Sequence, residues 1–334
     1  MEFATGMMRF LQKYWFLIGL ASAMALGHAF AIPLQAVSGM SGLRNSVVMA
    51  VMFLMALPLP LATIVETIKR PWAAFLASAI NLCLFPFAAW GISMLVDSSV
   101  RTGFLVVAAT PCTLASAAVW TRRASGNDVT ALMTTVITNT LSFVATPLIV
   151  FVLIRGSAEV QFIDMVIKLG MLVLLPMLFA QLAASRPSIG RWAAHHKSRL
   201  SIAAQSGILI VVLLGTAQTM LKMTPDQIPN GLTLIGLILV CSLLHCIVLT
   251  IGFLSAKALG FSRANQIAVA FAGSQKTLMI GLLVCIQLNV SLLPMVIYHA
   301  AQLTIDTFVA DKFRNRANAE SLNNSTNIKQ ESRR

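Results

Sequence analysis

The feature that most constrains this chain is a series of apolar runs of about twenty residues that follow one another from end to end. A run of that length crosses the ~30 Å hydrocarbon core of a bilayer as an α-helix. Only 10% of the 334 residues are charged, whereas soluble proteins carry about 25%. The sequence therefore predicts an all-α polytopic membrane protein and excludes a large soluble domain.

Charged and Pro- or Gly-rich segments divide the runs into ten predicted spans. These cover residues 14–33, 46–66, 72–96, 102–121, 128–154, 161–184, 201–221, 231–256, 264–288 and 291–310. With the N-terminus in the cytoplasm, eighteen Lys and Arg residues outside the spans lie on the cytoplasmic side and four on the outer side. Because basic residues accumulate in cytoplasmic loops, we expect both termini in the cytoplasm and the protein in the plasma membrane, the inner membrane of a bacterium. The net charge of +13 follows from this topology and does not indicate nucleic-acid binding.

The two ends of the chain carry separate signals. Residues 1–31 have a basic start, an apolar stretch and Ala29-Phe30-Ala31, which is the outline of a cleavable signal peptide. We favour retention of this segment as the first span, because the run is long enough to cross the membrane and keeps an even five-plus-five count. The transmembrane domain is then residues 1–312, and the polar residues 313–334 are expected to form a disordered cytoplasmic tail.

Because five is an odd number of spans, the second half of the chain crosses the membrane in the opposite direction to the first half. This is the topology of an inverted repeat. One span in each half is also interrupted near its centre, the fourth by residues 110–113 and the ninth by residues 273–277. A shift of 162 residues aligns Arg101 with Arg263, Pro111 with Gly273, and Asn127 with Asn289. The sequence therefore predicts two inverted five-helix repeats in which helices 4 and 9 are broken.

The paired interruptions indicate a binding site. Pro removes a main-chain donor and Gly tolerates unwound dihedrals, so both breaks free polar backbone groups at membrane depth. Such backbone persists only where it lines a polar cavity or is buried in protein, and corresponding breaks in two repeats mark the binding site of many transporters. The alternatives are an ordinary proline kink and a packing face of small residues.

Neutral polar side chains accompany the breaks. Thr135 and Asn139 are four residues apart and share one helix face. Side-chain and main-chain oxygens of this kind suit an alkali cation or the polar part of an organic solute, although each side chain could instead make an interhelical hydrogen bond worth ~0.6 kcal/mol. The candidate binding residues are Asn81, Thr110, Pro111, Thr113, Ser116, Thr135, Asn139, Gly273, Ser274, Gln275, Lys276 and Thr277.

Three segments carry a resemblance to a known family. They are KRPWAAFLASAINLCLFPFAAW (69–90), PCTLASAAVWTRRASGNDVTALMTTVITNTLSFVATP (111–147) and FAGSQKTLMIG (271–281). Together they resemble the bile acid:sodium symporter family over nearly the whole chain. The resemblance implies a panel domain of spans 1, 2, 6 and 7 against a core domain of spans 3–5 and 8–10, in which broken helices 4 and 9 cross near the membrane midplane.

The resemblance also implies two sodium ions behind that crossing. The first would involve Ser116, Thr135 and the ninth-span break, and the second would involve Gln275, Asn81 and the backbone around Ala272 and Ser274. The sequence departs from the family pattern at these sites. The shared ninth-span carboxylate is replaced by Phe271, the fourth-span Ser-Asn pair by Ala117-Ala118, the third-span Gln by Asn81, and the Asn after the ninth-span Gln by Lys276.

Lys276 is the residue that most needs explanation, since a charge at the bilayer centre costs ~3 kcal/mol or more. Our hypothesis is that its ammonium group takes the place of a bound sodium ion. It could also carry a proton or attract an anionic substrate, or its side chain could snorkel into a water-filled vestibule. Asp128 and Asp306 are expected near the cytoplasmic ends of their spans, so neither is an assured partner. His245 is interpreted as an intramembrane hydrogen-bonding residue.

The favoured function is secondary active transport, by alternating access, of an organic and anionic solute. Sodium-coupled symport follows from the resemblance, with Na⁺ as the only expected cofactor, as coupling ion. The alternatives are a sodium-independent or proton-coupled transporter with Lys276 as surrogate cation, a cation/proton antiporter, and a membrane regulator of cation flux. An enzyme is not expected, because the spans contain no metal cluster, nucleophile–base pairing or phosphate loop. The expected partners are the solute and the lipid bilayer.

Overall fold

The computed structural model describes residues 2–59, 71–114, 116–154, 161–222 and 229–331, and this part of the chain is helical without β-strands. In the first half of the chain the helices are α1 (Glu2–Ala29), α2 (Gln35–Ser38), α3 (Ser41–Ala56), α5 (Trp72–Ala79), α6 (Phe85–Ile92), α7 (Ser98–Ala109), α8 (Ser116–Arg123) and α9 (Asp128–Ile154). In the second half they are α10 (Phe162–Leu169), α11 (Leu175–Ala184), α12 (Pro187–His195), α13 (Lys197–Met220), α14 (Gly231–Ala258), α15 (Arg263–Ser274), α16 (Leu278–Leu288) and α17 (Leu293–Glu331).

Short turns of other helical types join some of these elements. A π-helical turn, η1 (Ile80–Leu84), joins α5 to α6, and another, η3 (Gly170–Leu174), joins α10 to α11. A 3₁₀ turn, η2 (Ser93–Leu95), follows α6. Proline explains both π-turns, because Pro86 and Pro176 stand at the second residue of the next helix and cannot donate to the preceding turn.

The predicted spans fall largely on helical segments, with interruptions at residues 110–114 and 275–277. Residues 60–66 and 115 lie outside the described residues. Within the described part, six helical segments are long and apolar enough to cross a membrane. They are Trp72–Leu95, Asp128–Ile154, Phe162–Ala184, Lys197–Met220, Gly231–Ala258 and Arg263–Leu288. Three shorter apolar helices cover Tyr14–Ala29, Ser41–Ala56 and Ser98–Ala109. The molecule is therefore an all-helical protein of the polytopic membrane type.

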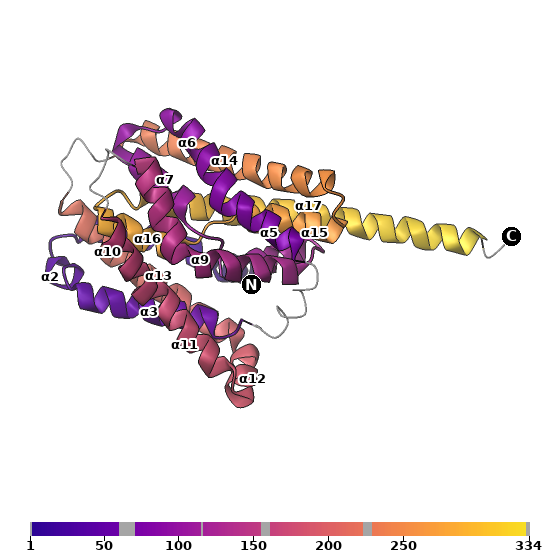
Figure 1. The fold of residues 1–334 in the computed structure, drawn as a ribbon, viewed down its shortest axis with the longest axis horizontal. Helices are drawn as coiled ribbons and strands as arrows, with labels where there is room; N and C mark the ends of the chain where they lie inside the picture. The colour runs from indigo at the N-terminus through magenta and orange to yellow at the C-terminus, as the bar shows by residue number, and fades with distance from the viewer. Residues whose placement is uncertain (1, 60–70, 115, 155–160, 223–228, 332–334) are drawn as a thin grey trace.

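Helix α17 includes most of the polar C-terminal segment. Helix α17 continues through residues 313–331 and ends at Glu331, projecting beyond the other helices (Figure 1). The physical reason lies in composition, since Ala317, Ala319, Glu320 and Lys329 are good helix formers and no Gly or Pro interrupts this segment.

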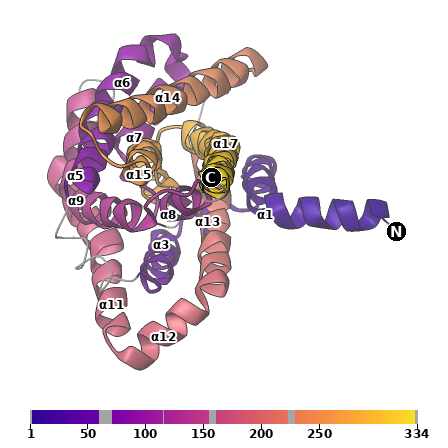
Figure 2. The ribbon, with the colours of Figure 1, turned by 90° about the vertical axis from the view of Figure 1, so that its right-hand side faces the viewer.

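The helices form two groups. Helices α1, α3, α11 and α13 pack on one another, and Figure 2 shows α3, α11, α12 and α13 on one side of the molecule. Helices α5, α9, α14, α15 and α17 pack together on the other side. The segment from α15 to α16 passes through the interior, and the whole of its most apolar 18-residue stretch is buried. Because this stretch is buried throughout, the ninth-span break lies at the centre of the fold.

Helix α7 approaches the main chain next to α17 closely at Gly103. A Cβ atom on Gly103 would overlap the main-chain oxygen of Ser291 and lie 3.1 Å from the Cγ of Pro294. On α6, a Cβ atom on Gly91 would meet no atom within 4 Å.

We therefore expect Gly103→Ala to destabilise the protein by about 1–3 kcal/mol through overpacking, despite the higher helix propensity of alanine. Gly91→Ala is the matched control and should leave stability equal or slightly higher. Thermal unfolding of the purified protein in detergent measures both. Equal midpoints for the two variants would contradict the close packing of α7.

Candidate functional site

The two predicted breaks meet in the interior. Helix α7 ends at Ala109 and α8 begins at Ser116, while α15 ends at Ser274 and α16 begins at Leu278. The main-chain N–H of Thr277 donates a hydrogen bond to the carbonyl of Pro111 at 2.9 Å, so one break is bonded directly to the other. Residues 110–114 and 274–277 are buried, which satisfies the condition for unwound backbone at membrane depth.

Lys276 lies in the ninth-span break with its side chain fully buried. Its Nζ donates to three main-chain carbonyl oxygens, those of Asn81 at 2.7 Å, Thr110 at 2.8 Å and Ala108 at 2.9 Å. The same nitrogen lies 4.3 Å from the centre of the Phe85 ring. Because an ammonium group has three donors, all are used, and the ring adds a cation–π attraction. The fully buried position shows that the side chain does not snorkel into a vestibule.

The three carbonyls can accept from Lys276 because the local backbone gives them no main-chain donor. Ala108 and Thr110 stand at the end of α7, where the last carbonyls of a helix have no internal donor and the helix dipole favours a cation. In η1 the N–H of Phe85 donates to the carbonyl of Ile80, and the next residue, Pro86, has no N–H. The carbonyl of Asn81 is therefore left free for Lys276.

Asn81 completes the same arrangement on the other break. Its Nδ2 donates to the carbonyls of Gln275 at 2.9 Å and of Ala272 and Gly273 at 3.2 Å. These carbonyls lie at the end of α15, where no helical donor remains. The resemblance assigned backbone oxygens around Ala272 and Ser274 to a second sodium ion. The carbonyl of Ala272 thus receives an N–H donor from Asn81, and that of Ser274 receives the hydroxyl of Tyr298.

Gln275 joins the breaks through its side chain. Its Oε1 accepts hydrogen bonds from Thr113 Oγ1 at 2.6 Å and Ser116 Oγ at 2.8 Å. Thr135 Oγ1 donates to the carbonyl of Thr113 at 3.1 Å, and Asn139 Nδ2 donates to the carbonyl of Cys112 at 2.8 Å. The face of α9 predicted from the spacing of Thr135 and Asn139 therefore contacts the fourth-span break.

Other candidates take part through their backbone or shape. Thr110 Oγ1 and Ser274 Oγ donate to carbonyls of their own helices, at 2.9 Å each, and do not point into the cluster. Pro111 contributes its carbonyl. At Gly273 a Cβ atom would lie 3.0 Å from the Cγ2 of Ile80, so a larger residue would press on η1.

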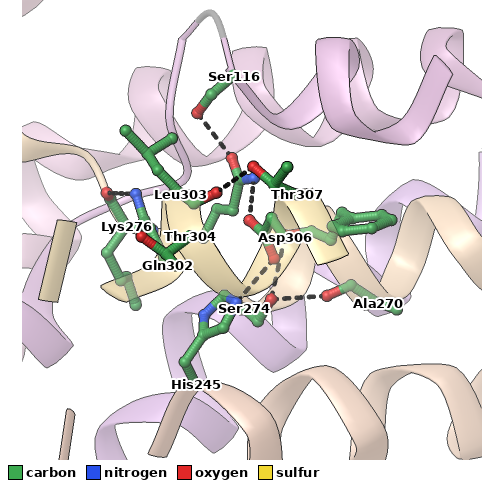
Figure 3. A network of polar contacts seen from close by, with 12 residues as sticks. Ser116, His245, Ala270, Ser274, Lys276, Gln302, Leu303, Thr304, Asp306 and Thr307 are labelled. Atoms are coloured by element: carbon green, nitrogen blue, oxygen red, sulfur yellow. Dashed lines mark hydrogen bonds and ion pairs between the residues drawn. The ribbon is translucent and has the colours of Figure 1, made fainter. Parts of the chain in front are cut away.

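Asp306 was expected near the end of its span and was not among the candidate binding residues, but it lies beside the ninth-span break. Its carboxylate is fully buried beside the ninth-span break, accepting from Gln275 Nε2 at 2.5 Å through Oδ2 and lying 2.8 Å from His245 Nε2 through Oδ1 (Figure 3). His245 Nδ1 contacts the Tyr298 hydroxyl at 3.0 Å, and that hydroxyl donates to the carbonyl of Ser274 at 2.8 Å. His245 is thus a hydrogen-bonding residue, as interpreted, and it has a carboxylate partner.

Gln302 was also missed by the sequence analysis. Its Oε1 accepts from the N–H of Lys276 at 2.9 Å and its Nε2 donates to the carbonyl of Lys276 at 3.0 Å (Figure 3). Tyr298, Gln302 and Asp306 are four residues apart and form one polar face of α17. That spacing is the signal that would have found them.

A cavity reaches this site from one end of the molecule. Its outer part, of about 420 Å³, lies between α1 and α13 on one side and α8 and α17 on the other, and is lined by Ser116, Arg123, Gln205 and Thr307. An inner part of about 80 Å³ shares Ser116 and Gln205 and adds Thr113, Thr277 and His299. The polar residues of both breaks therefore border a space that could hold part of a solute.

Asn81→Leu replaces the amide by an apolar group of similar size and leaves three buried carbonyls without a donor. We expect the free energy of unfolding to fall by at least about 2 kcal/mol, because each buried unsatisfied group costs ~1–3 kcal/mol. Cys83→Leu, at an exposed position of the same turn, is the control for a leucine in η1. Equal midpoints of thermal unfolding for Asn81→Leu and Cys83→Leu would argue against the role of Asn81.

Comparisons with known proteins bear on this site. Residues 14–315 match the model of the SBF-like CPA transporter family. The Escherichia coli (strain K12) protein named "Putative symporter YfeH" is 28% identical over 241 residues, which are 69% of this chain and 72% of that protein. Sodium/bile acid cotransporter 7 of Rattus norvegicus is 24% identical over 313 residues, 88% of this chain and 91% of that protein. Sodium/bile acid cotransporter 7-A of Xenopus laevis is 23% identical over 320 residues, 90% and 91% of the two chains.

Proposed function

This chain belongs to the SBF-like CPA transporter family, as its resemblance to the bile acid:sodium symporters implied, and on that basis we propose that it is a secondary active transporter of a small organic, anionic solute. The family and the named relatives are transporters and not enzymes. Together with its long apolar helices, family membership makes the chain an integral, multi-pass membrane protein. In this proposal the solute is moved by alternating access, and the cavity at Arg123 is one of its openings.

The proposed architecture is ten spans in two inverted repeats. Its main support is the contact between Thr113 and Gln275, which are 162 residues apart, the offset that aligns the two halves. Positions equivalent under a two-fold axis contact each other when they lie beside that axis. In this proposal α1, α3, α10–α11 and α13 form the panel and the other spans the core. With both termini in the cytoplasm, the cavity at Arg123 faces the cytoplasm.

The observation that carries the coupling proposal is the binding of Lys276 Nζ by three main-chain carbonyls. Three carbonyl oxygens lie 2.7–2.9 Å from Lys276 Nζ and together form a cation-binding site. The cation that occupies it is the side chain of Lys276 itself. The carbonyls of the other break are bonded to Asn81. The oxygens of Thr113, Ser116 and Gln275, in turn, are hydrogen-bonded to one another. This favours a sodium-independent mechanism, with Lys276 as surrogate cation, over the sodium coupling implied by the resemblance.

The anionic character of the solute is supported by the inner cavity. Thr277, Leu278 and Met279 line it, so it meets the N-terminus of α16, which has no side-chain cap. Ser116, the first residue of α8, lines the same space. Two half-helix N-termini, with the hydroxyl of Thr277 at one of them, form a favourable environment for a carboxylate or another organic anion.

The surrogate-cation proposal is tested by thermal unfolding in detergent at equal concentrations of sodium, potassium or choline chloride. The wild-type midpoint should not distinguish sodium from the other cations, because a ligand stabilises only a protein that binds it. Lys276→Asn removes the fixed cation and should gain sodium-dependent stability of about 1–3 kcal/mol when sodium exceeds its Kd roughly ten- to a hundredfold. Stabilisation of the wild type by sodium alone would overturn the proposal.

The solute proposal is tested by the same method with a panel of organic anions and their neutral analogues. Anions should raise the wild-type midpoint and their neutral analogues should not. Ser116→Ala and Thr277→Ala should each raise the Kd of an anion that stabilises the wild type about tenfold. This corresponds to the loss of one hydrogen bond of ~1.4 kcal/mol. Ser206→Ala, an exposed hydroxyl of α13, is the control. Equal stabilisation by charged and neutral analogues would reject an anionic solute.

A further inference from the structure

Helix α12 runs from the end of α11 to the start of α13 at one edge of the molecule (Figure 2). Its position is fixed by close packing. A Cβ atom on Gly190 would lie 2.6 Å from the main-chain oxygen of Ala184, so α12 lies directly against the end of α11. Ala193 is fully buried, and Ile189 packs against the core. This segment is therefore an ordered part of the fold.

The two faces of α12 differ in chemistry. Ile189, Trp192 and Ala193 recur at helical spacing and form its apolar face. Arg191 and His195 are four residues apart, lie on the opposite face and are exposed. At the boundary between the faces, Trp192 keeps 51% of its surface exposed. An amphipathic helix with an exposed Trp and basic residues is typical of a segment that lies in the interface of a membrane.

The arginines of this segment have no carboxylate partner. Arg186, Arg191 and Arg199 are exposed, and none of them forms an ion pair within the described residues. The sequence also contains no Asp or Glu between Asp164 and Asp226. No acidic side chain close in the chain is therefore present to neutralise this surface.

Other arginines on the proposed cytoplasmic side do have carboxylate partners. Arg122 pairs with Asp128, and Arg123 pairs with Asp311 at 2.7 Å. On α12, by contrast, Nε of Arg191 donates at 3.2 Å to a carbonyl of its own helix. The positive potential at α12 is thus left for an external anion, and the anion that a cytoplasmic leaflet offers at this depth is a lipid phosphate.

We propose that α12 and the arginines that flank it form a binding site for anionic phospholipid headgroups of the cytoplasmic leaflet. Guanidinium groups donate paired hydrogen bonds to phosphate oxygens, and the Trp192 ring packs at the level of the headgroups. Leu182 on α11 and Ile202 on α13, which are 68% and 50% exposed, continue the surface toward the acyl chains. The site goes beyond the proposed transport function and depends on neither the solute nor the coupled ion.

Binding is measured by thermal unfolding of the full-length protein in a neutral detergent, with phosphatidylglycerol or phosphatidylcholine added to the micelles. Phosphatidylglycerol should raise the wild-type midpoint more than phosphatidylcholine, because a ligand stabilises the folded state that binds it. In the variant Arg186→Gln with Arg191→Gln, the phosphatidylglycerol concentration that gives half of the stabilisation should rise at least about tenfold. Each lost positive charge weakens the attraction to an anionic lipid about fivefold.

Lys257→Gln with Lys312→Gln is the matched control, because it removes two exposed charges from α14 and α17, on the other side of the molecule. It should respond to phosphatidylglycerol as the wild type does. An equal loss in the two double variants would reduce the effect to general surface charge and overturn the site. Equal stabilisation by the two lipids would exclude recognition of an anionic headgroup. Glycerol 3-phosphate is the soluble probe, and an effect equal to that of phosphatidylglycerol would assign the arginines to a free phosphate compound instead of a lipid.

A second measurement tests the position of α12 without relying on affinity. In nanodiscs of phosphatidylglycerol, comparison with Trp192→Phe identifies the part of the fluorescence that comes from Trp192. Bromine atoms on the upper acyl carbons of the lipid should quench that part, because an interfacial helix buries its apolar face at the boundary of headgroups and acyl chains. Quenching by aqueous iodide alone would place α12 in water and overturn the proposal.

Discussion

The contact between the ammonium group of Lys276 and three carbonyl oxygens is the interaction on which the interior of this protein depends. It joins the end of α7, the π-turn before α6 and the break between α15 and α16, which are far apart in the sequence. Each of the three carbonyls lacks a helical donor, and the ammonium lacks a carboxylate. The unsatisfied groups of three broken helices therefore satisfy one another, and this permits irregular backbone deep in an apolar fold.

Hydropathy was sufficient to predict the helical segments, and Pro and Gly within the runs were sufficient to predict the two breaks, because both signals depend on local composition. Pro111 and Gly273 marked where the helices end, and the spacing of Thr135 and Asn139 gave the correct face of α9. In the C-terminal segment, low hydrophobicity removes a packing surface without removing the helix propensity of Ala, Glu and Lys, so α17 continues to Glu331.

The partners within the site could not be read from the sequence for two physical reasons. Lys276 is bound by backbone, and a carbonyl oxygen has no residue type by which it can be recognised. Asp306 and Gln302 stand near the end of an apolar run, where polar residues usually face water. Only the packing of α17 along the ninth-span break turns them inward. The carboxylate of Asp306 therefore pairs with His245 and not with Lys276.

The missing N–H of Pro86 has a consequence for how such a chain can change over generations. The proline leaves the Asn81 carbonyl open, and the lysine 190 positions later closes it. A descendant that loses the lysine alone is left with buried carbonyl oxygens that have no donor. In a descendant that loses the proline alone, the new main-chain N–H at position 86 competes with the lysine for the Asn81 carbonyl. Pro86 and Lys276 are thus expected to be inherited together. Where both are lost, a mobile ion is expected to occupy the site of the ammonium group.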